Sequence, residues 1–505
     1  MSLFSYHIFM FPFKWEMKGR EHLPFSERTN IKNFKLSPYS NWENIATPKT
    51  DTYKRELYNE KNFFYEFTHQ TLYDEDASEN MIQHYERKET YERDVTYKIH
   101  LIANKESLYT LKLKSISLNL YGTGVGVLLF YLENELYPDW NDVIRINQYG
   151  RRIYPPFLSV SNGIEGTKHA EIADFIAIEG LNGNPLNFFE DFTLYHPESF
   201  WKPARFITSL IAEFSDHIVL KPVIDDRMFV MCWYGNDKVS KELTEDYKTF
   251  KEKDEWYRYI FIDGDYSTCQ NAEMHEKLID KHTYGRWQKQ GSLYGITRYS
   301  SVFISNNSDF AVDVLLRTFR TIYCRIAELS LVQRASILKF SEEVTSISRL
   351  EDKETSKIVQ NVSDLYLQYI RFINKIYFRE ITAQDQGIEI YNKLQSTMKI
   401  RKQVKELDGE IEELHSYVTI LEDKGRNSNI ELLTIISSVI IIPSLIVAFA
   451  DMHEKKYWLP PLFLVLAGIT VFSIRNKKAE KKKMLMIYTV FILVFLLLFL
   501  ISLFP

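Results

Sequence analysis

The most distinctive hydrophobic pattern of the chain lies near its end, where three apolar segments without a charged residue cover residues 432–450, 458–474 and 484–504. A bilayer core of about 30 Å is crossed by roughly 20 helical residues. The first and third segments reach this length, and Trp458 suits the interface at the start of the middle one. The pattern predicts a transmembrane region with three spans over residues 431–505.

Lysine and arginine are concentrated between the second and third apolar segments. Residues 475–483 contain six of them, whereas residues 451–458 contain two basic and two acidic residues. By the positive-inside rule the basic loop is cytoplasmic, and so is the long front part of the chain. We therefore expect a multi-pass protein of the inner (cytoplasmic) membrane with a large cytoplasmic N-terminal domain. Binding of anionic lipid is a second role open to the lysines.

The front part alternates short apolar runs with turn residues. Residues 7–13 predict a first strand, and residues 110–121 and 127–132 predict two strands around the glycine-rich turn 122–126. A dinucleotide-binding loop requires a helix after the glycines, and none is indicated. Abundant tyrosine and phenylalanine suit a large sheet core, or a pocket that stacks a base. We expect an α/β sensor domain over residues 1–305.

Helical periodicity without proline replaces this pattern in the next part of the chain. Residues 309–348 and 354–379 are expected to form long amphipathic helices within a helical region of residues 306–385. The segment 383–387 is a plausible break before the next helix.

A heptad pattern marks that next helix, a predicted stalk over residues 386–430. Hydrophobic residues recur at alternating steps of four and three, with lysine and glutamate on the other faces. They are Ile400, Val404, Leu407, Ile411, Leu414, Val418 and Leu421. Such a seam requires a helical partner, either within the chain or in another copy.

The first predicted span carries small, mostly polar residues along one helical face. The candidate pore-lining residues are Thr434, Ser437, Ile441, Ser444 and Ala448. Asp451 follows on the same face, where a symmetric oligomer would form a ring of carboxylates at the outer pore mouth that attracts cations. The alternative is that the serines bond their own backbone or allow close helix packing.

Charge and cysteine content narrow the function classes. The whole chain carries −5, and the last 74 residues hold eight basic and three acidic residues, so residues 1–431 carry −10. This balance disfavours direct nucleic-acid binding. The three cysteines have no paired spacing, which argues against a disulfide framework or a thiolate zinc site. No nucleophile stands out beside a base, so we do not expect an enzyme.

One cluster in the front domain combines arginine with tyrosine. Arg145, Arg151 and Arg152 lie close in sequence to Tyr149 and Tyr154. Guanidinium groups bind phosphate and aromatic rings stack on a base, so these residues are candidates for binding a nucleotide ligand. A solvated turn whose arginines pair with carboxylates is the other interpretation.

A second, weaker candidate is Asp263-Gly264-Asp265. The carboxylates of Asp263 and Asp265 are suitable oxygen ligands for a regulatory divalent cation such as Mg²⁺. Asp-Gly is also typical of a tight hairpin turn.

Several segments around the first predicted span are similar, in their order along the chain, to those of a known family. They are Glu-Leu-His-Ser-Tyr at residues 413–417, Asn429, Leu-Thr-Ile-Ile at 433–436, Pro443, and the loop at 451–453. Together they resemble the stalk-to-pore region of the CorA family of divalent-cation transport proteins, over roughly residues 309–483. The resemblance implies a homo-oligomer, pentameric in that family, with a cytoplasmic α/β domain and a stalk helix that leads into the pore.

The chain departs from the family at the outer pore mouth. The family has Gly-Met-Asn there, whereas this chain has Asp451, Met452 and His453, so only the methionine matches. Loss of the asparagine puts selection of hydrated magnesium in doubt. A third span and a longer front domain are further departures. The loss of the filter together with the larger front domain favours a regulatory role rather than the supply of magnesium.

An offshoot of the CorA family that is associated with type III CRISPR systems is similar in layout. Its members respond to a nucleotide second messenger that joins S-adenosylmethionine to AMP (SAM-AMP). The leading hypothesis is therefore a CorA-like membrane ion channel that acts as an antiviral effector gated by such a messenger. A magnesium or other divalent-cation transporter and a membrane-tethered, non-conducting scaffold are the alternatives. The expected fold class is an α+β cytoplasmic domain with a long helical stalk and C-terminal transmembrane helices.

Overall fold

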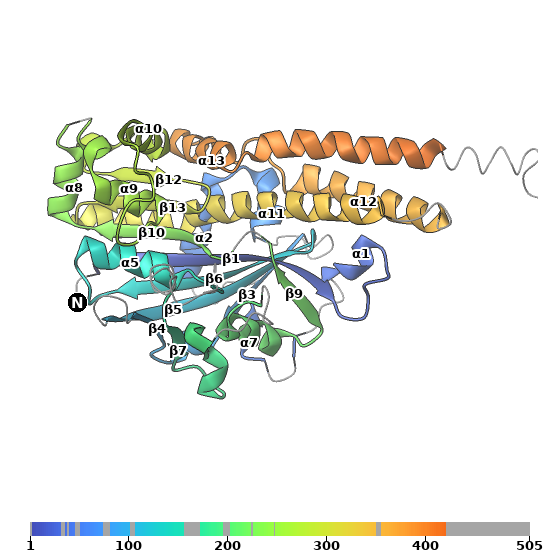
Figure 1. Ribbon diagram of the computed structural model, residues 1–505, viewed down its shortest axis with the longest axis horizontal. Coiled ribbons are helices and arrows are strands. Elements are labelled where there is room, and N and C mark those ends of the chain that lie inside the picture. Colours follow the sequence, from blue (N-terminus) through green and yellow to red (C-terminus); the bar gives the residue numbers. More distant parts are fainter. Residues whose placement is uncertain are drawn as a thin grey trace, which may run out of the picture. The chain divides into compact units, whose positions relative to one another are not determined.

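The computed structural model contains one large mixed sheet with helices packed on both of its faces (Figure 1). It describes residues 3–31, 36–37, 40–45, 51–73, 81–101, 107–155, 172–194, 202–223, 226–246, 248–349 and 355–420.

The first strand, β1 (Ser5–Met17), shows why the sheet has two covered faces. Side chains of a strand alternate between the two faces. Phe9 and Phe11 belong to the core on one face, whereas Ile8 and Met10 belong to the core on the other. Because both sets are apolar and fully buried, β1 lies in the middle of the sheet, with a neighbour along each edge. The strand predicted at residues 7–13 is confirmed.

Thirteen strands are present among the described residues, paired in the order β11-β12-β13-β10-β1-β6-β5-β4-β7-β8. Outside this order, β3 pairs with β5 and β2 pairs with β3, and β9 pairs with the second half of β1. Only the pairing of β10 with β13 is parallel. The strands are β1 (Ser5–Met17), β2 (Trp42–Asn44), β3 (Ile82–Arg87), β4 (Thr96–Leu101), β5 (Ser107–Tyr121), β6 (Val125–Asn134), β7 (Phe175–Glu179), β8 (Phe189–Asp191), β9 (Ile218–Pro222), β10 (Phe229–Gly235), β11 (Thr283–Tyr284), β12 (Leu293–Ile296) and β13 (Ser300–Ser305).

The predicted hairpin around residues 122–126 is also confirmed. It joins β5 to β6, and Gly124 in its turn has φ +70°, a conformation that favours glycine. A Cβ atom at Gly124 would lie only 2.5 Å from the methyl group of Thr29.

The helices divide between the two faces. Helices α5, α7 and α9 contribute to the core on one face, and α11, α12 and α13 pack on the other (Figure 1). The α-helices are α1 (Phe25–Arg28), α2 (Asp51–Phe63), α3 (His69–Tyr73), α4 (Glu89–Glu92), α5 (Trp140–Gly150), α7 (Arg205–Phe214), α8 (Asp237–Thr244), α9 (Asp254–Phe261), α10 (Ala272–His282), α11 (Cys324–Ile347), α12 (Thr355–Lys375) and α13 (Asp385–Thr397). The shorter helices are η2 (Glu66–Thr68), η3 (Pro185–Phe188), η4 (Phe192–Leu194), η6 (Thr249–Glu252), η7 (Gln288–Gln290), and the π-helices η8 (Ala311–Leu316) and η9 (Phe319–Tyr323).

Helix α11 packs on the sheet through a seam of polar residues. The Glu328 carboxylate accepts a hydrogen bond from the Tyr121 hydroxyl at 2.9 Å, and Ser336 bonds Thr123 at 2.7 Å. All four residues are nearly inaccessible to solvent. Buried polar groups must find partners, so this seam fixes how α11 is placed along β5 and the adjoining turn.

The heptad seam packs within the chain. Residues 400–420 are helical, and the apolar seam positions Ile400, Leu407 and Ile411 are buried in the same core as α12. Tyr366 of α12 stacks on the ring of His415, with the ring centroids 4.3 Å apart. A helix of the same chain therefore supplies the partner that the pattern requires.

The expected fold class, an α+β domain with a long helical stalk and C-terminal transmembrane helices, is wrong. The described residues form a large mixed-sheet domain, and α13 ends at Thr397 before a new helix begins at Ile400, with Lys399 between them at φ +58°. None of the helices in this part of the chain is long and apolar enough to cross a membrane. Its longest helix, α11, uses charged and polar side chains to pack on the sheet.

Residues Met1–Val418 form one compact unit. The predicted spans at 432–450, 458–474 and 484–504 lie outside the described residues.

Candidate ligand-binding groove

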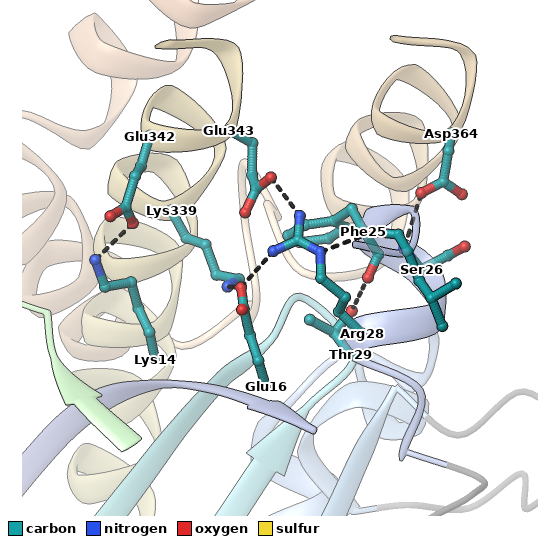
Figure 2. A network of polar contacts seen from close by, with 11 residues as sticks. Lys14, Glu16, Phe25, Ser26, Arg28, Thr29, Lys339, Glu342, Glu343 and Asp364 are labelled. Atoms are coloured by element: carbon teal, nitrogen blue, oxygen red, sulfur yellow. Dashed lines mark hydrogen bonds and ion pairs between the residues drawn. The ribbon is translucent and has the colours of Figure 1, made fainter. Parts of the chain in front are cut away.

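A network of ion pairs joins β1, α1 and α11 at one end of the sheet (Figure 2). Lys14 and Glu16 are two residues apart on β1, so their side chains point to the same face, toward α11. Helix α11 presents Lys339 to Glu16 and Glu342 to Lys14, and Glu343 lies on the same side of the helix. The network therefore follows from the strand and helix periods, which bring together residues about 320 positions apart.

The short helix α1 supplies a third cation, Arg28, to the network. Pro24 precedes α1, and Asp364 of α12 accepts a hydrogen bond from the Ser26 backbone at 2.8 Å. Phe25 packs against Phe340 of α11, with the ring centroids 5.4 Å apart. These contacts hold α1 against both helices and direct Arg28 into the network (Figure 2).

Two cations share the carboxylate of Glu16. Arg28 Nη1 lies 2.7 Å and Lys339 Nζ 2.8 Å from Glu16 Oε1, and Arg28 also pairs with Glu343 at 2.5 Å. Burial opposes ionisation of Glu16, but Lys339 and Arg28 outweigh it and lower the pKa of Glu16 below its ordinary value. Burial lowers the pKa of Lys339, while Glu16 opposes this shift.

Two cavities adjoin this network and share Lys14, Lys221 and Glu342 as lining residues. The first, about 610 Å³, lies between β1, α1, α11 and α12. The second, about 890 Å³, lies along β9 and α7. Both volumes are within the range of about 300–1,000 Å³ that is typical of small-molecule sites. We call the two cavities together the basic groove.

Lysine and arginine outnumber carboxylates in the basic groove by eight to five. The basic residues are Lys14, Lys18, Arg28, Lys202, Lys221, Lys339, Arg349 and Lys357. The acidic residues are Glu16, Glu21, Asp216, Glu342 and Glu343. This excess of positive charge lies on a part of the chain whose net charge is −10, so the groove is suited to an anionic ligand.

The lining of the second cavity is less charged and more apolar. Ile211 of α7 and Leu220 of β9 contribute aliphatic surface, and Pro203 and the ring of Tyr154 lie beside them. A ring or another apolar group fits such a surface. Tyr154 is the one predicted ligand-binding residue that lines either of these two cavities.

Two other residues of the arginine and tyrosine cluster, Arg145 and Tyr149, lie on a helix. Helix α5 begins after Asp139, whose carboxylate accepts a hydrogen bond from the Asn141 backbone, and its apolar side includes the buried Val143 and Ile146. Arg145 is on this helix and pairs with Asp265 at 2.6 Å. Tyr149 is 3% exposed.

Arg151 and Arg152 follow α5 and are both buried. Arg152 pairs with Asp226. Arg151 donates through Nη2 to Gln148 Oε1 at 3.0 Å and to the Ile262 carbonyl at 3.1 Å. Burial lowers the pKa of Arg151, and the nearby charge of Arg152 adds to this shift. The two arginines therefore make interior contacts and do not line either cavity.

The two aspartates of the candidate metal site have protein partners. Asp263 accepts hydrogen bonds from the backbone and hydroxyl of Thr268 at 2.9 and 2.7 Å, and Asp265 pairs with Arg145. Within the ranges that the structure describes, no group of three or more histidine, cysteine, aspartate or glutamate residues is arranged to hold a metal ion.

The fold brings Cys232 and His7 together, although they are 225 positions apart in the sequence. Cys232 Sγ lies 3.4 Å from His7 Nδ1, and the same nitrogen lies 2.7 Å from Asn147 Oδ1. Both residues are fully buried. Burial raises the pKa of the Cys232 thiol to about 12 and lowers that of His7 to about 4, so both groups are neutral near pH 7. Their geometry suits a hydrogen-bonded core better than an activated nucleophile.

Sequence reasoning missed the basic groove because its residues come from four distant parts of the chain. The one local signal is the alternation of charge and aromatic residues in β1, where Lys14 and Glu16 flank Trp15. The predicted pore residues Thr434, Ser437, Ile441, Ser444 and Ala448, and the pore-mouth residues Asp451, Met452 and His453, lie outside the described residues. Comparison of the chain with protein-family models, curated proteins and solved structures found no match.

Proposed function

We propose that this protein is a ligand-gated ion channel, in which residues 1–418 bind a nucleotide second messenger and the C-terminal segment conducts ions across a membrane. The observation that carries the proposal is the basic groove, with eight basic and five acidic residues on an otherwise acidic body. A phosphate-bearing ligand is favoured in such a groove, whereas a free divalent cation is disfavoured.

The membrane part of the proposal rests on the sequence. The three apolar segments after residue 431 contain no charged residue, and the basic loop at residues 475–483 suits the cytoplasmic side. The resemblance to the CRISPR-associated offshoot of the CorA family points to SAM-AMP as the messenger and to antiviral defence as the role. A homo-oligomer is part of the proposal through that resemblance alone, because the heptad seam packs within the chain.

Ion flux from liposomes that contain the full-length protein tests the proposal. We expect SAM-AMP, added on the side of the large N-terminal domain, to raise the flux. Arg349→Gln, an exposed residue of the first cavity, should raise the ligand concentration that gives half of the effect. Arg317→Gln removes the same charge from an exposed position that does not line the groove, and should leave the response unchanged.

Two other results would replace the proposal. Flux that falls with internal magnesium and ignores SAM-AMP would indicate a divalent-cation transporter. No flux under any condition, with no effect of Asp451→Asn on ion permeability, would indicate a membrane-tethered scaffold. CRISPR components encoded beside this gene would support the effector role independently of the flux assay.

A further inference from the structure

Two lysines face each other where the two cavities of the basic groove meet. Lys14 of β1 and Lys221 of β9 are directly opposite each other in the antiparallel pair, so their side chains lie on the same face of the sheet. Both residues line both cavities. Like charges directly opposite each other destabilise a strand pair. Because the two lysines do not stabilise the sheet, we look for a role in binding.

The carboxylate beside the two lysines neutralises only one of them. Glu342 of α11 pairs with Lys14 at 2.5 Å. Lys221 is exposed, and none of the described carboxylates lies within ion-pair distance of it. The junction of Lys14, Lys221 and Glu342 therefore has a net charge of +1 and one lysine available to a ligand.

From this geometry we infer that the phosphate of the proposed messenger binds between Lys14 and Lys221, while the two parts that it joins occupy the two cavities. The inference rests on the proposed function and names the residues that hold the charge of the ligand. A phosphate at this point accepts charge-assisted hydrogen bonds from both ammonium groups and removes their mutual repulsion.

The two cavities favour different halves of such a molecule. The first is lined by polar and charged groups, among them the exposed Arg349, which suit a half rich in hydrogen-bonding groups. The second offers the ring of Tyr154 and aliphatic surface, which suits an aromatic or other apolar half. A ligand that fills only one cavity would leave half of this surface unused.

Glu342 competes with the phosphate in this arrangement. Its carboxylate holds Lys14, and its negative charge lies at the edge of both cavities. Since its side chain is 55% exposed, its removal costs little stability. Neutralising Glu342 should therefore strengthen binding of an anion, which is the opposite of what loss of a ligand contact does.

Isothermal titration of the full-length protein in detergent tests the inference. The probes are a dinucleoside monophosphate with two adenines, AMP and inorganic phosphate. We expect the dinucleoside monophosphate to bind most tightly, Lys221→Gln to weaken its binding at least about tenfold, and Glu342→Gln to tighten it. Lys289→Gln makes the same change at an exposed lysine outside the groove and should have no effect.

Three results would overturn the inference while leaving the proposed function in place. They are equal affinities of Lys221→Gln and Lys289→Gln, weaker binding by Glu342→Gln, or inorganic phosphate binding as tightly as the dinucleoside monophosphate. Failure of every probe to bind, together with flux that ignores SAM-AMP, would instead remove the proposed function itself.

Discussion

The ion-pair network of the basic groove makes a quantitative prediction about stability. Arg28 contacts two carboxylates, and the exposed fractions of the Arg28, Glu16 and Glu343 side chains are 14%, 26% and 11%. Arg28→Met keeps much of the aliphatic stem but leaves Glu343 without its cation. Removing one partner from a buried ion pair costs about 3–5 kcal/mol, so the free energy of unfolding should fall by about that amount.

The Lys14–Glu342 pair in the same network provides a matched control. Its carboxylate is 55% exposed, and exposed ion pairs contribute about 0–1 kcal/mol. Lys14→Met also removes the repulsion from Lys221 on the neighbouring strand. We therefore expect Lys14→Met to change the free energy of unfolding by less than about 1 kcal/mol.

Urea unfolding of the full-length variants in detergent, followed by tryptophan fluorescence, measures both effects. Arg28 and Lys339 hold the pKa of Glu16 below its ordinary value, so this pairing stabilises the fold near pH 7 and is lost as the pH falls through the folded-state pKa. The difference between wild type and Arg28→Met should therefore shrink as the pH falls below the ordinary pKa of a glutamate carboxyl. Equal stabilities of Arg28→Met and Lys14→Met near pH 7, or a difference that does not depend on pH, would refute the reasoning.

Three further predictions concern the scaffold. Gly180→Ala should cost at least about 1–3 kcal/mol in a urea titration, because Gly180 has φ +97° and a Cβ there would lie 2.6 Å from the Asp94 carbonyl oxygen; an unchanged midpoint would contradict this. Burial holds the pKa of His7 near 4, so wild type should lose stability as the pH falls from about 6.5 toward 4, and His7→Asn should lose less over that interval. Leu407→Ala should cost about 2–5 kcal/mol in thermal unfolding without changing the oligomeric state, whereas dissociation of an oligomer in light scattering would show that the seam joins copies.

Local patterns in the sequence predicted the elements whose signals are periodic. The run at residues 7–13 and the glycine turn at 122–126 lie in β1 and the β5–β6 hairpin, and residues 354–379 largely coincide with α12. In each case neighbouring residues determine the outcome, through strand alternation, a left-handed turn or helical periodicity. The heptad pattern predicted that a helix packs against the seam, but the spacing of the residues does not identify which helix that is.

The candidate site was not predictable in the same way. Arg151 and Arg152 look like ligand-binding residues in sequence, yet burial beside Gln148 and Asp226 gives them interior partners. Conversely, nothing near Lys14 in the sequence indicates that Lys221 lies opposite it. That pairing depends on the register of β9 against β1, which long-range packing sets.

The position of the charges on α11 gives the proposed gating a physical basis. This helix carries Lys339 and Glu342 in the basic groove, and its polar seam with the sheet continues to Glu328, three turns away. Buried polar seams hold a helix in discrete placements, because an intermediate one leaves groups unpaired. A ligand shifts the equilibrium between two placements of α11 only to the extent that it binds one placement more tightly than the other. Under our proposal the phosphate supplies that difference by replacing Glu342 at Lys14. Helix α11 packs in the same core as the helix at residues 400–418. The placement of α11 therefore affects the position of that helix, which leads to the predicted membrane region.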